Sequence, residues 1–136
     1  MISGVNHITF AVKDLEKSFD FYTGLLGLKP VATWEGGAYL TAGNTWIALN
    51  LDNTVSGAAQ QGYSHIAFTC TRDRFPTLKK ALLEYGCSQW AKNESEGESF
   101  YFLDPDGHQL EIHDGDLMSR LDAVKKNPTT EFTYYT

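Results

Sequence analysis

Residues 93–113 of the chain read NESEGESFYFLDPDGHQLEIH. A polar loop at 93–99 leads into a predicted strand at 100–103, the Asp-Pro-Asp-Gly turn at 104–107 reverses the chain, and a second strand follows at 109–113. Side chains alternate between the two faces of a strand. One face of this hairpin therefore carries the polar groups Ser99, Tyr101, Gln109, Glu111 and His113, whereas the other carries Phe100, Phe102, Leu110 and Ile112. The pattern predicts a ligand-binding face over a core face.

Length and composition predict one soluble domain. The 136 residues can bury a sizeable core. The net charge is −6 and the longest basic run is Lys125-Lys126, so nucleic acid is not an expected partner. Cys70 and Cys87 are too few for a disulfide scaffold and are expected to be free thiols. No apolar run approaches the about 20 residues of a membrane span, and the start of the chain lacks a signal-peptide pattern, so we expect a cytoplasmic protein.

The chain repeats one pattern of predicted elements. The segment His7-Ile8-Thr9-Phe10 matches His65-Ile66-Ala67-Phe68, a lag of 58 residues (65 − 7). Each copy reads as a strand, a helix and three strands, at 5–12, 15–26, 30–34, 38–41 and 45–51, and again at 63–70, 75–85, 88–91, 99–103 and 109–113. Asp14 is expected to cap the first helix and Gly27 to end it, and residues 71–73 and Gly86 do the same for the second.

A duplicated unit of this length needs its second copy to complete a core. We therefore predict an α+β fold of two tandem βαβββ modules in a single domain, residues 1–136. Module one covers about 1–52, a linker about 53–62, and module two about 63–125. A short terminal helix is expected at 117–124 and carries Arg120.

Three possible metal ligands lie on three separate predicted strands. His7 and His65 occupy the same position of the repeated unit, and Glu111 lies on the last strand of the second unit. All three are predicted on the face opposite the apolar one. Two imidazoles and one carboxylate suit a divalent ion such as Mn, Fe, Ni, Co or Zn, with positions left open for a substrate. Each residue alone is more typical of a structural or solvated side chain, and the repeated phase is what favours a metal site.

Other polar residues admit two interpretations each. His108 is expected to bond the backbone of its turn, and His113 to lie beyond the site, so neither is included. The loop 93–99 is either solvated filler or a site where hydroxyls and carbonyls bind a monovalent cation or an oxyanion. Arg120 is either an ordinary surface charge or, with Tyr101, a partner for a bound anion.

The motifs resemble those of one known family, the metal-dependent fosfomycin-resistance thiol transferases of the vicinal-oxygen-chelate (glyoxalase-like) superfamily. The resemblance extends over residues 1 to about 125 and rests on VNHIT, AYL, WIAL, YSHIAF and the 93–113 segment with GDLMSRL after it. The two-His, one-Glu set is general to the superfamily. The SEGESFYFLDPDGH segment is narrower and is similar to the glutathione-using, potassium-stimulated branch.

The resemblance implies an interleaved homodimer in which His7 of one chain joins His65 and Glu111 of the other around Mn²⁺. It implies that glutathione opens the epoxide of fosfomycin, with catalytic roles for Thr9, Tyr39 and Arg120. The implied substrate-binding residues are Thr9, Trp46, Tyr63, Lys92, Ser95, Ser99, Tyr101 and Arg120, and Trp34 and Tyr39 would lie toward the thiol. Potassium would be framed by Asn93, Ser95, Glu96, Gly97 and Ser99.

The sequence departs from the family pattern at three places. Ala91 stands where the branch has a lysine, and Lys92 follows it, shifted by one residue and hence to the other face of a strand. Glu94 and Gly36 replace a basic and a polar residue, respectively. These changes leave the identity of the thiol undecided. The alternatives are another thiol, an extradiol dioxygenase, an epoxide hydrolase, or a protein that binds a small anion or drug without turnover.

Overall fold

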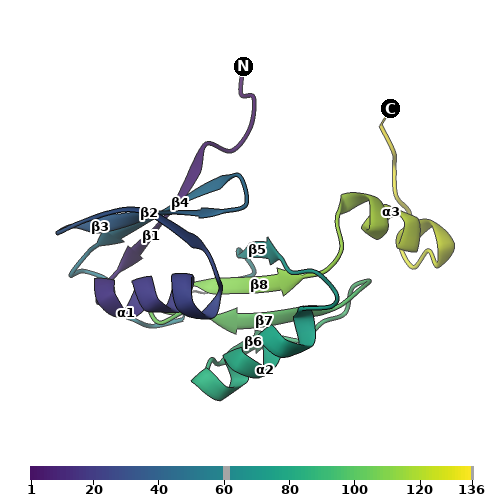
Figure 1. Ribbon diagram of the computed structural model, residues 1–136. Helices are drawn as coiled ribbons and strands as arrows, with labels where there is room; N and C mark the ends of the chain where they lie inside the picture. The colour runs from purple at the N-terminus through teal and green to yellow at the C-terminus, as the bar shows by residue number, and fades with distance from the viewer. Residues whose placement is uncertain (60–61, 136) are drawn as a thin grey trace.

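Each half of the chain folds into a four-stranded mixed sheet with helices beside it (Figure 1). The structure is a computed structural model that describes residues 1–59 and 62–135. The first sheet has the order β1-β4-β3-β2, with bounds β1 (His7–Val12), β2 (Lys29–Trp34), β3 (Gly37–Ala42) and β4 (Thr45–Leu51). The second has the order β5-β8-β7-β6, with bounds β5 (Ile66–Thr69), β6 (Gln89–Ala91), β7 (Ser99–Leu103) and β8 (Gln109–His113). The predicted α+β class with paired βαβββ units is confirmed.

Three helical segments accompany the sheets: α1 (Leu15–Asp20) with its π-helical continuation η1 (Phe21–Leu25), α2 (Phe75–Tyr85) and α3 (Leu117–Lys126). Asp14 caps α1 by accepting a hydrogen bond from the Lys17 amide, as predicted. Gly27 and Gly86 take the left-handed conformation after their helices, with φ of 80° and 97°. The π turn was not predicted, and it directs the consecutive residues Phe21 and Tyr22 both into the core.

Two predicted details of the second unit are wrong. No side chain of residues 71–73 caps α2, because the amides of Arg74 and Phe75 both bond to the carbonyl of Thr71 instead. The strand predicted at 63–70 is shorter, since the Gln109 side-chain amide bonds the carbonyls of Gly62 and Ser64 where a strand partner would be expected. His65 therefore lies directly before β5 rather than within it.

One apolar core joins the two units. Phe10, Phe21 and Leu49 from the first unit belong to the same cluster as Phe102 and Leu110 from the second. The rings of Phe21 and Phe102 lie 6.4 Å apart, centre to centre. The core face of the 99–113 hairpin is thus buried against the other half of the chain, which leaves the Glu111 face for the site.

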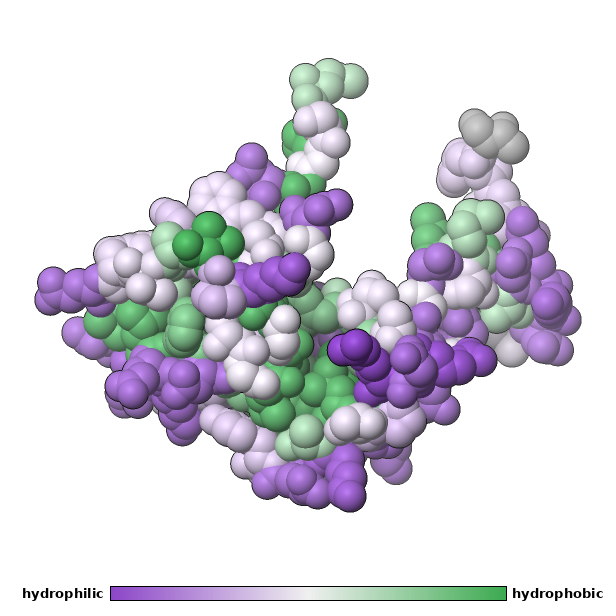
Figure 2. All heavy atoms as spheres, viewed as in Figure 1, coloured by the Kyte–Doolittle hydropathy of each residue, from purple (hydrophilic) through white to green (hydrophobic). Residues whose placement is uncertain are grey.

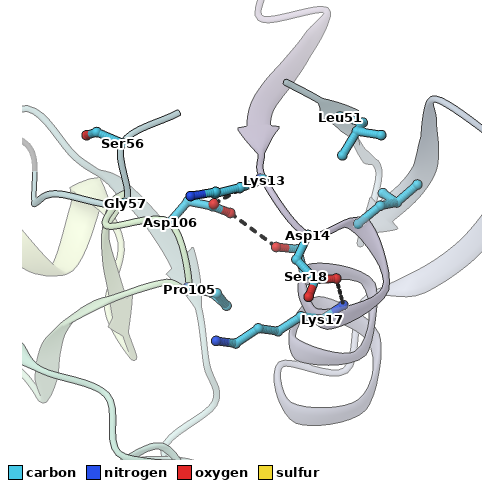
Figure 3. A pocket seen from close by; sticks show the side chains of 10 residues that line it. Lys13, Asp14, Lys17, Ser18, Leu51, Ser56, Gly57, Pro105 and Asp106 are labelled. Atoms are coloured by element: carbon cyan, nitrogen blue, oxygen red, sulfur yellow. Dashed lines mark hydrogen bonds between the residues drawn. The ribbon is translucent and has the colours of Figure 1, made fainter. Parts of the chain in front are cut away.

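The Asp-Pro-Asp-Gly turn forms a polar joint between the two units. Asp104 accepts a hydrogen bond from the Tyr22 hydroxyl at 2.6 Å, and Asp106 accepts from the Ser18 hydroxyl and the Lys13 amide. Figure 3 shows Asp106 beside Lys13 and the start of α1, at a pocket of about 600 Å³. None of the residues that line this pocket is a predicted site residue. The joint therefore fixes how the two sheets meet.

Tyr22→Phe tests the joint. Burial raises the pKa of Asp104, and its carboxylate would lose the Tyr22 hydroxyl as a donor. Removing a bond to a buried charged group costs about 1.5–3 kcal/mol of unfolding free energy. We expect urea unfolding to report that loss, whereas Tyr85→Phe, at an exposed position, leaves the midpoint unchanged. Equal midpoints for the two variants would show that the joint contributes no stability.

The segment between the two units has no regular structure where it is described. Residues 52–59 contain neither helix nor strand. Residues 60 and 61 of the predicted linker lie outside the described residues, so the linker and the module bounds stay predictions. Among the described helices, none has both the length and the apolar character needed to cross a membrane.

Candidate metal and anion site

His65 and Glu111 meet at the open side of the second sheet. β5 runs parallel to β8 and places Ala67 beside Glu111, so the residue two before Ala67 lies near the same carboxylate. The Nε2 atom of His65 is 2.9 Å from Oε1 of Glu111, whose side chain is buried. Two of the three predicted metal ligands are therefore adjacent within one chain.

The contacts of His65 allow either a proton or a cation to bind between it and Glu111. Its Nδ1 is 2.7 Å from the carbonyl of Tyr63, and because a carbonyl only accepts, Nδ1 carries the proton. Nε2 then turns its lone pair toward a carboxylate oxygen, so two acceptors face each other unless a proton or a cation lies between them. A backbone carbonyl that bonds the second imidazole nitrogen is the usual support of a metal-bound histidine. The donor chemistry fits a divalent ion.

Ser99 links Glu111 to His113. The Ser99 hydroxyl donates to Oε2 of Glu111 at 2.7 Å, and Nδ1 of His113 lies 2.7 Å from the same hydroxyl. Nε2 of His113 is 3.2 Å from a carboxylate oxygen of Glu96. The prediction that His113 lies beyond the site is wrong. β7 and β8 pair Ser99 with His113, so the two face each other across the hairpin.

The loop 93–99 brings Arg120 to the same place. Arg120 donates from Nε to Glu96 at 2.9 Å and from a terminal nitrogen to the Ser95 hydroxyl at 3.2 Å. The bond from Arg120 holds the pKa of Glu96 below its usual range. Asn93 fixes the loop by accepting from the amide and hydroxyl of Ser95 and donating to the carbonyl of Gly97. The loop is thus structured, and Arg120 is not a free surface charge.

Aromatic rings close the other side of the site. Tyr101 is buried next to Glu111, and burial raises the pKa of its phenol, which also bonds to Tyr63 and Ser95. Trp90 lies against His65, Tyr63 and Tyr101 with ring centres 5.2–5.6 Å apart. Trp90 donates to the carbonyl of Leu110, which fixes its indole. Sequence reasoning missed Trp90, although its place directly before Ala91 in a predicted strand was visible.

A second group of predicted residues lies on the open face of the first sheet. β1 and β3 flank β4, which puts Thr9 and Tyr39 on either side of Ala48, and His7 and Thr41 on either side of Trp46. The rings of Trp34, Tyr39, Trp46 and His7 follow one another at 4.3–5.2 Å. Gly37 permits this packing, since a Cβ there would lie 2.8 Å from the Trp34 ring. Trp34, Tyr39 and Trp46 are 36–43 % exposed, so this face of the sheet presents aromatic surface to solvent.

The two groups do not meet within one chain. Within residues 1–59 and 62–135, the three metal-type donors that approach one another within 4.8 Å are Asp104, Asp106 and His108, and His7 does not join His65 and Glu111. The Nε2 of His108 lies 2.8 Å from the carbonyl of Ala11, not from its own turn as predicted. Because hydrogen bonds across the joint engage all three of these residues, we interpret that cluster as structural.

Lys92 was predicted to contact the substrate. It is exposed and follows the last residue of β6, Ala91, which pairs with Tyr101. This contact with the substrate and the other residue roles stay predictions.

Comparisons with known proteins agree with this architecture. Residues 4–112 match the family model of the Glyoxalase/Bleomycin resistance protein/Dioxygenase superfamily. The glutathione transferase FosA of Serratia marcescens is 46 % identical over 130 residues, covering 94 % of this chain and 92 % of that protein. The metallothiol transferase FosB of Shouchella clausii is 39 % identical over 131 residues, covering 93 % and 90 %.

A solved structure shares the fold as well. A mutant of the fosfomycin resistance protein FosX from Listeria monocytogenes, complexed with Mn(II) and 1S,2S-dihydroxypropylphosphonic acid, superimposes with a TM-score of 0.77 at 26 % identity, covering 89 % of this chain and 99 % of that one. These findings confirm the resemblance drawn from the sequence motifs. The chain belongs to the Glyoxalase/Bleomycin resistance protein/Dioxygenase superfamily and, within it, to the family of fosfomycin-resistance thiol transferases.

Proposed function

We propose that the protein is a metal-dependent thiol transferase that inactivates fosfomycin by adding glutathione to its epoxide. The observation that carries the proposal is the His65–Glu111 pair, with Nε2 of the imidazole 2.9 Å from a buried carboxylate beside the Ser95–Arg120 loop. The relatives named glutathione transferase and metallothiol transferase support the same activity.

A divalent metal, with Mn²⁺ as the proposed ion, would be held by His65 and Glu111 of one chain and His7 of a second. Such an ion would polarise the epoxide oxygen and stabilise the negative charge that develops on it. Nδ1 of His7 lies 2.7 Å from Asn6, and its ring packs 4.3 Å from Trp46, so the ring is held at the start of β1. The proposed ligands are therefore rigidly placed, His7 by its strand and Glu111 by its burial.

The phosphonate would bind the groups that surround Ser95. Arg120 supplies a fixed charge, Tyr101 would supply a neutral donor, and Thr9 joins them from module one of the second chain. Ser95 and Ser99 would donate once their hydroxyl protons turn away from Asn93 and Glu111, which accept them in the present structure. Guanidinium bonds to phosphonate oxygens are charge-assisted and geometrically specific. An anion at this place would compete with Glu96 for Arg120, which binds that carboxylate in the present structure. Lys92 remains a proposed contact with the substrate at the edge of this site.

The reaction needs no covalent enzyme intermediate. The thiol loses its proton to solvent, the thiolate sulfur forms a bond to an epoxide carbon, and the carbon–oxygen bond on the opposite side breaks. The oxygen then takes a proton from solvent, so the product is a hydroxy thioether phosphonate. The side chains contribute orientation of the two reactants and complementary charge.

The thiol would lie on the aromatic face of module one. Trp34, Tyr39 and Trp46 expose ring surface there, and Tyr39 and Thr9 flank Ala48 of β4 from the two neighbouring strands. Among the relatives described above, the one with the higher identity is named a glutathione transferase, which favours glutathione as the thiol. We further propose that potassium occupies the loop framed by Asn93, Ser95, Glu96, Gly97 and Ser99, since hydroxyl, carboxylate and carbonyl oxygens suit a hard monovalent ion.

A second copy of the chain would complete the site. β1 and β5 each form one edge of their sheet, and an open groove of about 1180 Å³ runs between them. Figure 2 shows apolar atoms gathered across the middle of this face of the molecule. Ile8, Ile66 and Phe68 line the groove, and α3 buries no residue of its own. Unpaired edges and apolar grooves are the features that an interleaved homodimer would cover.

Phosphorus NMR of fosfomycin tests the function. The protein is incubated with Mn²⁺, potassium and, in separate samples, glutathione, L-cysteine, another small thiol or no thiol. We expect a new phosphonate resonance with glutathione that depends on both metal and protein. Product without thiol would indicate a hydrolase, and product with another thiol alone would replace glutathione. No product in any sample would overturn the proposal.

Arg120→Ala should weaken the binding of fosfomycin. Loss of a charged hydrogen-bond donor costs about 1.5–3 kcal/mol, which corresponds to a rise in KM of roughly tenfold to a hundredfold. Steady-state kinetics at saturating thiol would measure this rise. Lys80→Ala, which removes an exposed cation from α2, is the control and should leave KM unchanged. An unaltered KM in Arg120→Ala would show that Arg120 does not bind fosfomycin and is an ordinary surface charge.

A further inference from the structure

Asp114 stands where the end of β8 meets the loop 93–99. Its Oδ1 accepts a hydrogen bond from the amide of Glu98 at 2.8 Å, and its own amide donates to the carbonyl of Glu98 at 3.2 Å. Its Oδ2 accepts from Nε of Arg72 at 3.1 Å, while its side chain is 2 % exposed. Both carboxylate oxygens are therefore engaged, one by the loop and one by the segment between β5 and α2.

The packing around Asp114 leaves the loop little freedom to shift. Gly97 has a φ of 71°, and a Cβ there would lie 2.5 Å from Oδ1 of Asp114. The residue after Glu98 is Ser99, whose hydroxyl bonds Glu111, and three residues before Glu98 is Ser95, which accepts from Arg120. The bond between Asp114 and Glu98 thus fixes the loop between two residues that the proposed function assigns to the phosphonate.

We propose that Asp114 is a positioning residue for the anion-binding loop, acting through the Glu98 amide, with Arg72 as a dispensable outer partner. The carboxylate at 114 sets the backbone at 97–98 and so the direction of the Ser95 and Ser99 hydroxyls. This rests on the proposed function only for the identity of the anion. The contact with Glu98 is a feature of the chain itself.

Three variants distinguish the roles of the two carboxylate oxygens of Asp114. Asp114→Ala removes both contacts, Asp114→Asn keeps an oxygen that accepts from the Glu98 amide, and Arg72→Ala removes only the exposed partner. We expect Asp114→Ala to raise the KM for fosfomycin about tenfold with little change in kcat. Asp114→Asn and Arg72→Ala should stay within about twofold of the parent protein, well below that tenfold rise.

Amide hydrogen exchange provides a readout that needs no turnover. We expect the Glu98 amide to exchange at least about tenfold faster in Asp114→Ala than in the parent, and at the parent's rate in Asp114→Asn and Arg72→Ala. Equal Glu98 exchange in all variants would overturn the positioning role. So would a Asp114→Asn variant that matches Asp114→Ala, since that would assign the effect to the ion pair with Arg72. If fosfomycin were not a substrate, the exchange result would still decide the role of Asp114.

Discussion

Glu111→Ala is expected to abolish high-affinity manganese binding and, with it, turnover of fosfomycin. Glu111 is buried and its Oε1 lies 2.9 Å from Nε2 of His65, so its removal takes away the charged ligand of the proposed set. Loss of a group that merely supports a metal ligand typically lowers affinity 10–100-fold. Loss of a ligand itself should therefore lower Mn²⁺ affinity by more than about a hundredfold. Titration calorimetry on the metal-free protein measures the change directly.

Two controls make this result specific. Glu84→Ala removes an exposed carboxylate from α2 and should leave Mn²⁺ binding unchanged. Asp106→Asn alters the other cluster of metal-type donors and should also retain Mn²⁺, because its carboxylate is already engaged by Ser18 and Lys13. Loss of manganese in Asp106→Asn, with normal binding in Glu111→Ala, would move the metal to the Asp104–Asp106–His108 joint.

The sequence predicted well what depends on local pattern. Alternation in residues 99–113 predicted that Tyr101 and Glu111 share the polar face of the hairpin, and the structure pairs these two residues across it. The repeat of the His-Ile segment indicated two equivalent sheets, and both were found with the same strand order. Polar-face and core-face assignments in strands follow from side-chain geometry alone, so they needed no knowledge of distant contacts.

What the sequence could not give are contacts that depend on how separate elements meet. His113 lies two residues past Glu111 on the same strand and was therefore predicted to lie beyond the site. Ser99 on the paired strand and Glu96 in the loop before it nevertheless contact His113. His108 looked like a turn residue, but the two units pack so that it bonds the carbonyl of Ala11, 97 positions earlier. The length of the strand that ends at residue 70 was overestimated for the same reason. The Gln109 side-chain amide bonds the carbonyls of Gly62 and Ser64, the backbone groups predicted to pair with a neighbouring strand.

Neither the sequence nor one folded chain brings the whole proposed site together. Module one presents His7, Thr9 and three exposed aromatic rings, whereas module two presents His65, Glu111 and the Arg120 loop. In the proposed homodimer, another copy of the chain supplies the missing half of each site. The symmetry of such an assembly makes a quantitative prediction, because each dimer would contain two sites and each site one half from each chain.

Mixing two inactive variants should restore activity. His7→Ala and Glu111→Ala are each expected to be inactive, because every site in either homodimer lacks one ligand. In a mixed dimer, the site built from His7 of the Glu111→Ala chain and Glu111 of the His7→Ala chain is intact, while the second site lacks both. After unfolding and refolding of an equal mixture, random pairing makes about half of the dimers mixed, so about a quarter of all sites are intact. The specific activity should reach about a quarter of that of the parent protein treated in the same way. If each site instead drew His7, His65 and Glu111 from the same chain, every chain in the mixture would still lack one ligand, and the mixture would remain as inactive as its components.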